Sequence, residues 1–182
     1  MRLTPLEIPE VLLVEPTVHE DNRGFFLETW HAEKFRAAGL DVGFVQDNHS
    51  RSVQHTLRGL HYQLVEPQGK LVRVVTGEIF DVAVDLRRSS PTFGCWVGAT
   101  LRETDFRMLW IPPGFAHGFL ALSAQTDVLY KCTTPYQGQH DRTLRWNDPA
   151  VGVQWPLPSG IEPRLSPKDA SGVALDIAET YP

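Results

Sequence analysis

The stretch Ile79-Phe80-Asp81-Val82-Ala83-Val84-Asp85-Leu86 decides the fold of this chain. In an extended conformation one face of this stretch carries Phe80, Val82, Val84 and Leu86, and the other carries the remaining four residues. This period of two predicts a β-strand. Short apolar runs recur along the chain with Pro, Gly, Ser and Asp between them, at residues 57–63, 70–75, 96–101, 108–111, 118–122 and 128–133. The series predicts an all-β protein, an antiparallel jelly-roll barrel or sandwich with a few short helices.

Three segments in the first third of the chain have patterns of their own. Residues 11–18 form an apolar run that Pro16 breaks, which predicts an edge strand. Residues 32–38 predict one short helix, which Gly39 ends. Residues 44–50 begin as a strand and end in a dense polar cluster, which fits either a surface loop or a set of amides that read the edge of a heterocyclic base.

Length and composition are those of one globular domain. The chain has 182 residues, of which 42% are hydrophobic and 21% charged, so it can bury a core. The proline-rich segment from about residue 147 predicts a tail that wraps the barrel within a single domain spanning 1–182. The formal charge of −5 disfavours a nucleic-acid partner. No stretch resembles a bilayer span or a signal peptide, so we expect a cytoplasmic protein without a membrane partner, in which Cys95 and Cys132 are reduced and buried.

Basic side chains gather around one predicted turn. The stretch Leu57-Arg58-Gly59-Leu60-His61-Tyr62-Gln63 is followed closely by Gln68-Gly69-Lys70-Leu71-Val72-Arg73. Any one of these basic groups would suit the surface of an ordinary barrel strand. Together, one imidazole, one ammonium and two guanidiniums indicate a site for an anionic ligand.

A metal site is the first possibility for a jelly roll that contains histidines. Pro112-Pro113-Gly114-Phe115-Ala116-His117 fits the Pro-x-Gly-x-x-His pattern of the second metal motif of cupins, a jelly-roll family. The first cupin motif requires a His-x-His pair with a glutamate a few residues on. The matching position is His61-Tyr62-Gln63, where a glutamine replaces the second histidine, and Glu66 is too isolated to complete three ligands. We therefore expect a cupin-like barrel that holds no metal.

The remaining groups suit proton chemistry. A histidine is a useful base near neutral pH when a carboxylate holds its other ring nitrogen. Asp169 is a candidate partner for His61, although it would equally suit a solvated turn. The Lys70 ammonium could stabilise an oxyanion. Tyr130 would share a strand face with Val128 and Cys132, which suits either a core tyrosine or an acid.

Eleven segments of the chain, including the two basic stretches and Leu165-Ser166-Pro167-Lys168-Asp169, resemble those of the dTDP-4-dehydrorhamnose 3,5-epimerase family. The resemblance runs in order from about residue 10 to about residue 175. Its segments are residues 23–28, 44–50, 57–63, 68–73, 80–85, 90–94, 110–112, 114–119, 129–131, 146–148 and 165–169.

The resemblance implies a metal-free, cofactor-free barrel that works as a homodimer, with an N-terminal strand lent to the partner's sheet. It implies that His61 is the general base, oriented by Asp169, and that Lys70 faces the C4 keto oxygen of the sugar. Tyr130 would be the general acid on the opposite face of the ring. The substrate would be dTDP-4-keto-6-deoxyglucose, inverted at C3 and C5 to give the 4-keto-rhamnose precursor of dTDP-rhamnose.

The resemblance also implies a set of residues that line the nucleotide-sugar site. In this set, arginine and lysine would suit the pyrophosphate and aromatic rings would stack on thymine. This chain has Asp141 where the family commonly has glutamate, which shortens a possible hydrogen bond to the nucleotide. The implied residues are Arg23, Phe26, Glu28, Gln46, Asn48, Arg58, His117, Tyr136, Asp141 and Lys168.

Strand geometry sets a condition on this site. Arg58 and His61 are three residues apart, so a regular strand would point them to opposite faces. A bulge at Gly59 would re-aim one of them.

Three alternative functions remain open at this point. A relative that inverts only C3 would keep His61, Lys70 and Tyr130, and product stereochemistry would separate it from a 3,5-epimerase. A metal cupin, such as a dioxygenase or sugar isomerase, would lose activity with a chelator. A non-catalytic sugar-binding cupin is disfavoured, because a pure binder needs neither an acid nor a base.

Overall fold

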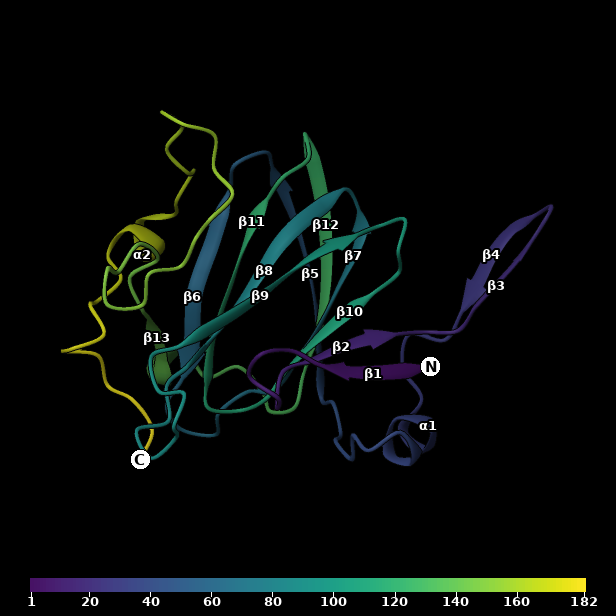
Figure 1. Cartoon of the computed structure of the whole chain (residues 1–182), viewed down its shortest axis with the longest axis horizontal. Helices are drawn as coiled ribbons and strands as arrows, with labels where there is room; N and C mark the ends of the chain where they lie inside the picture. Colours follow the sequence, from purple (N-terminus) through teal and green to yellow (C-terminus); the bar gives the residue numbers. More distant parts are fainter.

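Two antiparallel sheets face each other and form the body of the protein (Figure 1). The computed structural model describes residues 1–182. One sheet has six strands in the order β1 (Arg2–Pro5), β2 (Leu12–Glu15), β10 (Met108–Ile111), β7 (Lys70–Thr76), β12 (Gln125–Cys132) and β5 (Gln46–Val53). The other has five in the order β13 (Asp141–Thr143), β6 (Leu57–Gln63), β11 (Phe115–Ala121), β8 (Glu78–Asp85) and β9 (Trp96–Arg102). The predicted all-β antiparallel architecture is confirmed.

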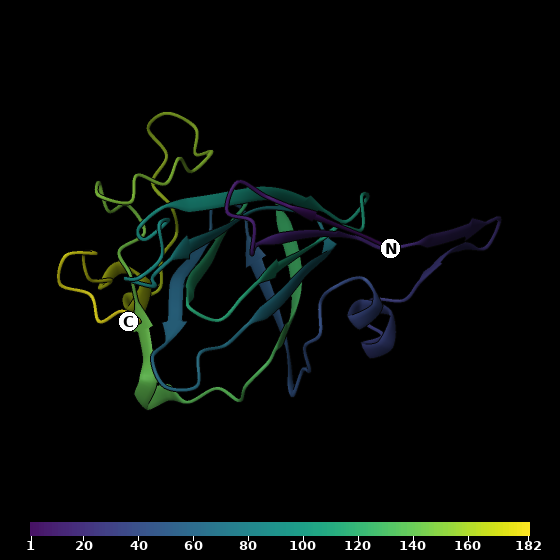
Figure 2. The same cartoon turned by 60° about the horizontal axis from the view of Figure 1, so that its bottom comes forward.

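The other elements are small. Strands β3 (Val18–Asp21) and β4 (Gly24–Leu27) pair into a hairpin that projects away from the barrel in both views (Figures 1 and 2). The predicted short helix is α1 (Ala32–Ala37), whose Phe35 is buried against the outer face of the six-stranded sheet. The 3-10 turn η1 (Gly138–His140) comes directly before β13, and the tail contains the single-turn helix α2 (Pro167–Ala170). None of these helices has the length and apolar character needed to cross a bilayer.

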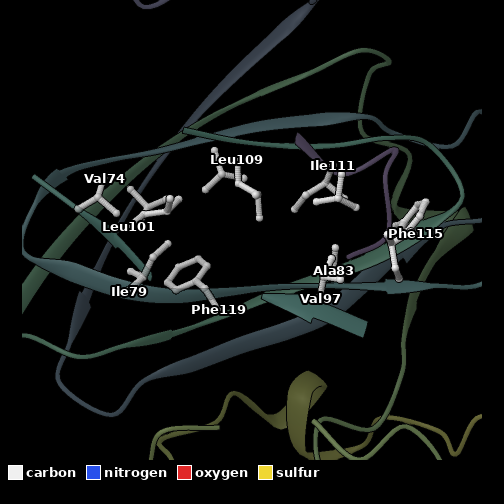
Figure 3. Close-up of a cluster of buried hydrophobic side chains, with 13 residues drawn as sticks. Val74, Ile79, Ala83, Val97, Leu101, Leu109, Ile111, Phe115 and Phe119 are labelled. Atoms are coloured by element: carbon white, nitrogen blue, oxygen red, sulfur yellow. The ribbon is translucent and has the colours of Figure 1, made fainter. Parts of the chain in front are cut away.

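The main hydrophobic core lies between the two sheets (Figure 3). It contains thirteen buried residues, drawn from β7, β10 and β12 on one side and from β8, β9 and β11 on the other, together with Ile8 and Val11 from the segment between β1 and β2. Burying a large aliphatic or aromatic side chain stabilises a fold by about 1.5–3 kcal/mol. This cluster therefore fixes the spacing of the sheets, between which a polar cavity also lies.

Strand β8 shows the alternation that the sequence predicts. Ile79 and Ala83 face the core between the sheets, whereas Val82 and Val84 face outward into a second buried cluster. The C-terminal segment supplies the other side of that second cluster, through residues that include Val151, Trp155, Leu175, Ala178 and Tyr181. Both faces of β8 are buried as a result.

In the N-terminal half, one prediction is wrong and one of two alternatives is excluded. The strand in residues 11–18 is β2, which lies between β1 and β10 and is therefore internal. Pro16 follows its last residue, so the proline removes no hydrogen bond from the ladder. The polar cluster at residues 46–50 is not a loop, because β5 continues to Val53 and pairs with β12 along its whole length.

The two cysteines have different environments. Cys132 is buried at the end of β12, as expected, but Cys95 is exposed, so the expectation that both are buried is wrong. Neither forms a disulfide.

Candidate active site

A polar cavity of about 320 Å³ opens between the sheets. Strands β5, β7 and β12 supply one wall, strands β6, β11 and β13 supply the other, and α2 closes part of the rim. Its sixteen lining residues are Gln46, Asn48, Ser50, Arg58, His61, Tyr62, Gln63, Gln68, Lys70, His117, Phe119, Tyr130, Cys132, Tyr136, Asp141 and Lys168.

His61 on β6 is bound to a buried carboxylate from the tail. Its Nε2 lies 2.5 Å from Oδ1 of Asp169, whose side chain is 4% exposed. The same oxygen accepts a hydrogen bond from the backbone N–H of Gly59 at 3.2 Å. Burial lowers the pKa of His61, and the hydrogen bond to Asp169 opposes that shift. The imidazole is therefore neutral at pH 7 and held in one orientation.

Helix α2 presents Asp169 through an N-terminal cap. Ser166 has an extended backbone, and its hydroxyl accepts from the backbone N–H of Asp169 at 3.1 Å. Pro167 occupies the first helical position, where its fixed φ favours the helix and no donor is lost. The Ser166 hydroxyl also donates to Oδ2 of Asp169 at 2.6 Å. Burial alone would raise the pKa of Asp169, but the hydrogen bonds from His61 and Ser166 lower it to about 2.

The condition on strand geometry is met by a β-bulge. His61 lies opposite His117 and Arg58 lies opposite Phe119, so β6 has two residues where β11 has one. Gly59 lies in the bulge with φ of +130°, and a Cβ there would come within 2.5 Å of the Gly118 backbone. The bulge lets Arg58 and His61 line the same cavity.

Lys70 and Tyr130 belong to the wall opposite His61. Lys70 begins β7, is 7% exposed, and its Nζ donates to the carbonyl oxygen of His61 at 3.4 Å. Burial lowers the pKa of Lys70 and raises that of Tyr130. Tyr130 on β12 lines the cavity on the same strand face as Val128 and Cys132, as predicted.

His117 is held by a carboxylate that the sequence analysis did not assign to the site. Its Nε2 lies 2.6 Å from Oδ1 of Asp81, and the two side chains are 8% and 0% exposed. Asp81 faces the interior on β8, and its Oδ2 has no hydrogen-bond partner. The signal was present in the sequence, because the alternation of β8 places this carboxylate on the face that carries Ile79 and Ala83.

The inward face of β5 forms a wall of neutral polar groups. Gln46 Nε2 donates to Asn48 Oδ1 at 3.0 Å, and Asn48 Nδ2 contacts Cys132 Sγ at 3.5 Å. Ser50 also lines this wall, and its hydroxyl is buried without a partner. Arg58 reaches across from β6, with its Nε donating to Ser52 Oγ at 3.0 Å. The other wall residues that the sequence analysis did not single out are Tyr62, Gln63, Gln68 and Phe119.

The rim of the cavity holds a second charged group of residues. Tyr136 OH donates to Asp141 Oδ2 at 2.8 Å, and the Lys168 ammonium forms an ion pair with the same oxygen. Gln46 Oε1 accepts from the backbone N–H of Tyr136 at 2.8 Å, which ties the rim to β5. Four of the proposed binding residues thus meet at one edge of the cavity.

Arg23, Phe26 and Glu28 lie outside this cavity. They belong to the projecting hairpin and the residue that follows it, where Arg23 pairs with Asp21 and Glu28 with Lys34. Phe26 is 67% exposed. Within one chain the structure does not bring these three residues to the other eleven candidates, of which ten line the cavity and Asp169 contacts His61.

The histidines of the cavity are engaged by carboxylates and do not converge on a common point. Nowhere in the chain do three or more His, Cys, Asp or Glu side chains come together as a candidate metal site. His61 and His117 are neighbours across β6 and β11, but each ring nitrogen Nε2 is bound to a different carboxylate.

An imidazole held by a buried carboxylate, an ammonium and a phenol in one cavity are the groups of an enzyme that moves protons on a bound small molecule. The family model described as dTDP-4-dehydrorhamnose 3,5-epimerase matches residues 5–176. The chain therefore belongs to the dTDP-4-dehydrorhamnose 3,5-epimerase family, as the sequence analysis predicted, and it is an isomerase.

Individual relatives agree with this family and with the cupin-like fold. A dTDP-4-dehydrorhamnose 3,5-epimerase of Pseudomonas aeruginosa is 52% identical over 183 residues, covering 100% of both chains. The structure of a Legionella pneumophila 3,5-epimerase in complex with dTDP-4-keto-L-rhamnose has a TM-score of 0.93 and 46% identity, covering 98% of this chain and 94% of that one. A 3'-monoepimerase from Streptomyces bikiniensis in complex with dTDP-quinovose is more distant, with a TM-score of 0.88 and 34% identity over 97% of this chain and 88% of that one.

Proposed function

We propose that this protein converts dTDP-4-keto-6-deoxy-D-glucose to dTDP-4-keto-L-rhamnose by inverting C3 and C5. The observation that carries the proposal is the placement of His61 and Tyr130 on opposing walls of one cavity. Inversion requires a base on one face of the sugar ring and a proton donor on the other, because a single group would return the proton to the face it left. Relatives about 50% identical are named as 3,5-epimerases, which favours inversion at both carbons.

In the first step, His61 removes the proton on C3. Asp169 occupies Nε2, so Nδ1 is the nitrogen that accepts the proton. The electron pair of the C–H bond forms a double bond between C3 and C4, and the electrons of the C4 carbonyl double bond move to its oxygen, which becomes negatively charged. The buried Lys70 ammonium stabilises that enolate, and such a donor is worth about 10²–10³ in kcat at other oxyanion sites.

In the second step, Tyr130 delivers a proton to C3 from the opposite face. Burial raises the pKa of Tyr130, so its hydroxyl is protonated at neutral pH and available to donate. The cycle leaves His61 protonated and Tyr130 ionised, and exchange with solvent restores both groups. The same sequence at C5 completes the reaction without a metal or another cofactor.

The basic rim residues suit the nucleotide diphosphate. Arg58 and Lys168 line the cavity as a guanidinium and an ammonium, the groups that bind phosphate oxygens. Gln46, Asn48 and Tyr136 offer amides and an aromatic ring for the thymine. His117, held by Asp81, would contact the sugar from the same wall as His61.

The proposal includes a homodimer in which Arg23, Phe26 and Glu28 act on the partner's site. The hairpin projects from its own barrel (Figure 1), and Phe25 and Phe26 are 56% and 67% exposed. Strand β1 ends the six-stranded sheet, so one of its edges is free to pair with a second copy. Exchange of this N-terminal segment would bring the three missing candidates to a cavity.

Solvent deuterium incorporation tests the reaction. Chelator-treated protein is incubated with dTDP-4-keto-6-deoxyglucose in heavy water, and the sugar is examined by NMR. We expect deuterium at both C3 and C5 with inverted configuration. Label confined to C3 would make the protein a 3-epimerase, and no label at either carbon would refute the assigned base and acid.

Subunit mixing tests the exchange. A double variant Arg23→Ala/Phe26→Ala is mixed under exchange conditions with His61→Asn, each being inactive alone. If the hairpin acts on the partner, the mixed dimer contains one site with an intact base and an intact hairpin, and activity returns to about a quarter of the wild-type value at equal mixing. If the hairpin acts on its own chain, no mixture recovers activity.

A further inference from the structure

Asp141 is the single carboxylate among the sixteen residues that line the cavity. The same cavity contains the cationic side chains of Arg58, Lys70 and Lys168. A carboxylate in a cavity for an anionic ligand repels that ligand, so its presence there indicates a second role. The contacts of Asp141 indicate what that role is.

Asp141 accepts two donors at one oxygen. Its Oδ2 takes the hydrogen bond from Tyr136 OH at 2.8 Å and the ion pair from Lys168 Nζ. The Asp141 side chain is 11% exposed, whereas that of Lys168 is 45% exposed. Asp141 is also fixed by its backbone, because it pairs with Gln63 in the ladder of β13 and β6. The aspartate is therefore the immobile partner, and the lysine is the one that can turn.

The ion pair also ties α2 to the barrel. Lys168 precedes Asp169 on this single-turn helix, and Asp169 contacts His61 and Gly59 on β6. The helix is thus attached to the β6 and β13 edge of the five-stranded sheet through two consecutive residues.

We propose that Asp141 is a positioning residue, the resident counter-ion that holds Lys168 at the rim until the substrate diphosphate displaces it. This inference rests on the proposed function, in which Lys168 binds the diphosphate. Each binding event then exchanges one ion pair for another, so the nucleotide gains less than the full attraction of Lys168. The exchange limits affinity and favours release of a product that carries the same diphosphate.

A direct contact of Asp141 with the thymine base is the competing explanation. If Asp141 contacts the base, replacing Asp141 would change the affinity for thymidine, which has no phosphate, as much as the affinity for dTDP. If the ion pairs exchange, the replacement would change the affinity for dTDP alone.

The experiment measures the dissociation constants of dTDP and thymidine by calorimetry for the wild type and five variants. Asp141→Asn removes the charge and keeps an oxygen for Tyr136, and Asp141→Glu keeps the charge. Asp41→Asn is the matched control, because Asp41 is a surface aspartate paired with Arg36 and does not line the cavity. Lys168→Met and the double variant Lys168→Met/Asp141→Asn show whether Asp141 acts through Lys168.

We expect Asp141→Asn to bind dTDP about two- to fivefold more tightly than the wild type, the range for a partly exposed ion pair. The gain should shrink at high salt. Asp141→Glu and Asp41→Asn should bind dTDP as the wild type does, and thymidine binding should be the same in Asp141→Asn and the wild type. In the Lys168→Met background, Asp141→Asn should change dTDP binding by less than the single variant does.

Other results would overturn the proposal. Unchanged or weaker dTDP binding by Asp141→Asn would mean that the aspartate does not compete for Lys168. Weaker thymidine binding by Asp141→Asn would mean that Asp141 contacts the base. An equal gain in dTDP affinity in the Lys168→Met background would mean that Asp141 repels the diphosphate directly and does not act through Lys168. Failure of the wild type to bind dTDP would instead refute the proposed function itself.

Discussion

Replacing Asp169 by asparagine removes one charge from the site and almost no volume. In the wild type, Oδ1 of Asp169 lies 2.5 Å from His61 Nε2, and its side chain is 4% exposed. When His61 takes the substrate proton, this hydrogen bond becomes one between two charged groups. Hydrogen bonds to charged groups contribute about 1.5–3 kcal/mol, which corresponds to about 10- to 150-fold in rate.

The tautomer of His61 adds to this loss. The amide that replaces the carboxylate in this variant can donate to Nε2, and that tautomer carries its proton on Nδ1, the nitrogen that must accept one. We therefore expect Asp169→Asn to lower kcat by about 10²–10⁴. Burial lowers the pKa of His61 and the bond to Asp169 opposes that shift, so the variant should also have a lower His61 pKa. The acidic limb of kcat/KM should then move to lower pH.

The assay follows deuterium entry at C3 and C5 across a pH series, with urea unfolding to check that the variant is folded. Ser166→Ala is the control, because it removes a hydrogen bond to Asp169 but keeps the carboxylate. We expect this control to lose less than about tenfold in kcat. If Asp169→Asn kept a tenth of wild-type kcat with an unmoved acidic limb, Asp169 would not orient the base.

Three further outcomes follow from the site and the core. Tyr130→Phe should keep deuterium exchange through His61 but lose inverted product, and inversion at the wild-type rate would remove Tyr130 as the acid. Lys70→Gln should lower kcat by about 10²–10³. Burial lowers the pKa of Lys70 and the ammonium is the active form, so as the pH is raised the wild-type kcat should begin to fall before pH 10.5, the ordinary lysine pKa, is reached. Asp85 has a side chain that is 0% exposed, and hydrogen bonds, chiefly from Arg87, outweigh burial and lower its pKa to about 2. Above pH 4 this carboxylate should contribute about 2 kcal/mol to the free energy of unfolding, and this contribution should be lost as the pH falls from 4 to 2. Urea titrations of the wild type in which the free energy of unfolding did not decrease over that range would contradict this prediction.

The sequence predicted best where burial and alternation coincide. β8 could be assigned with both of its faces, because apolar residues alternate along it and each face meets a different cluster. β5 could not be followed past its polar residues, because its inward side chains face a polar cavity and carry no apolar signal. The strand is fixed instead by its pairing with β12, which is a contact between distant parts of the chain.

Long-range contacts also explain what was missed in the site. The sequence named Asp169 as a possible partner of His61 but left a solvated turn equally open, since 108 residues separate the two. Gly59 indicated the bulge in advance, because glycine adopts the required backbone conformation. The distance of Arg23 and Phe26 from the cavity depends on the direction in which a hairpin leaves the barrel, and no local pattern encodes that direction.

The position of α2 late in the chain has a consequence for protein synthesis. The strands of the barrel precede residue 144, whereas Asp169 is made 108 residues after the histidine it holds. At about 5–20 residues per second, a ribosome adds Asp169 about 5–20 s after His61. During that interval the nascent chain has the imidazole but not the carboxylate that orients it. Each new chain therefore forms the contact between His61 and Asp169 only after residue 169 has been added, and a chain released before that residue would carry a barrel whose imidazole has no carboxylate partner.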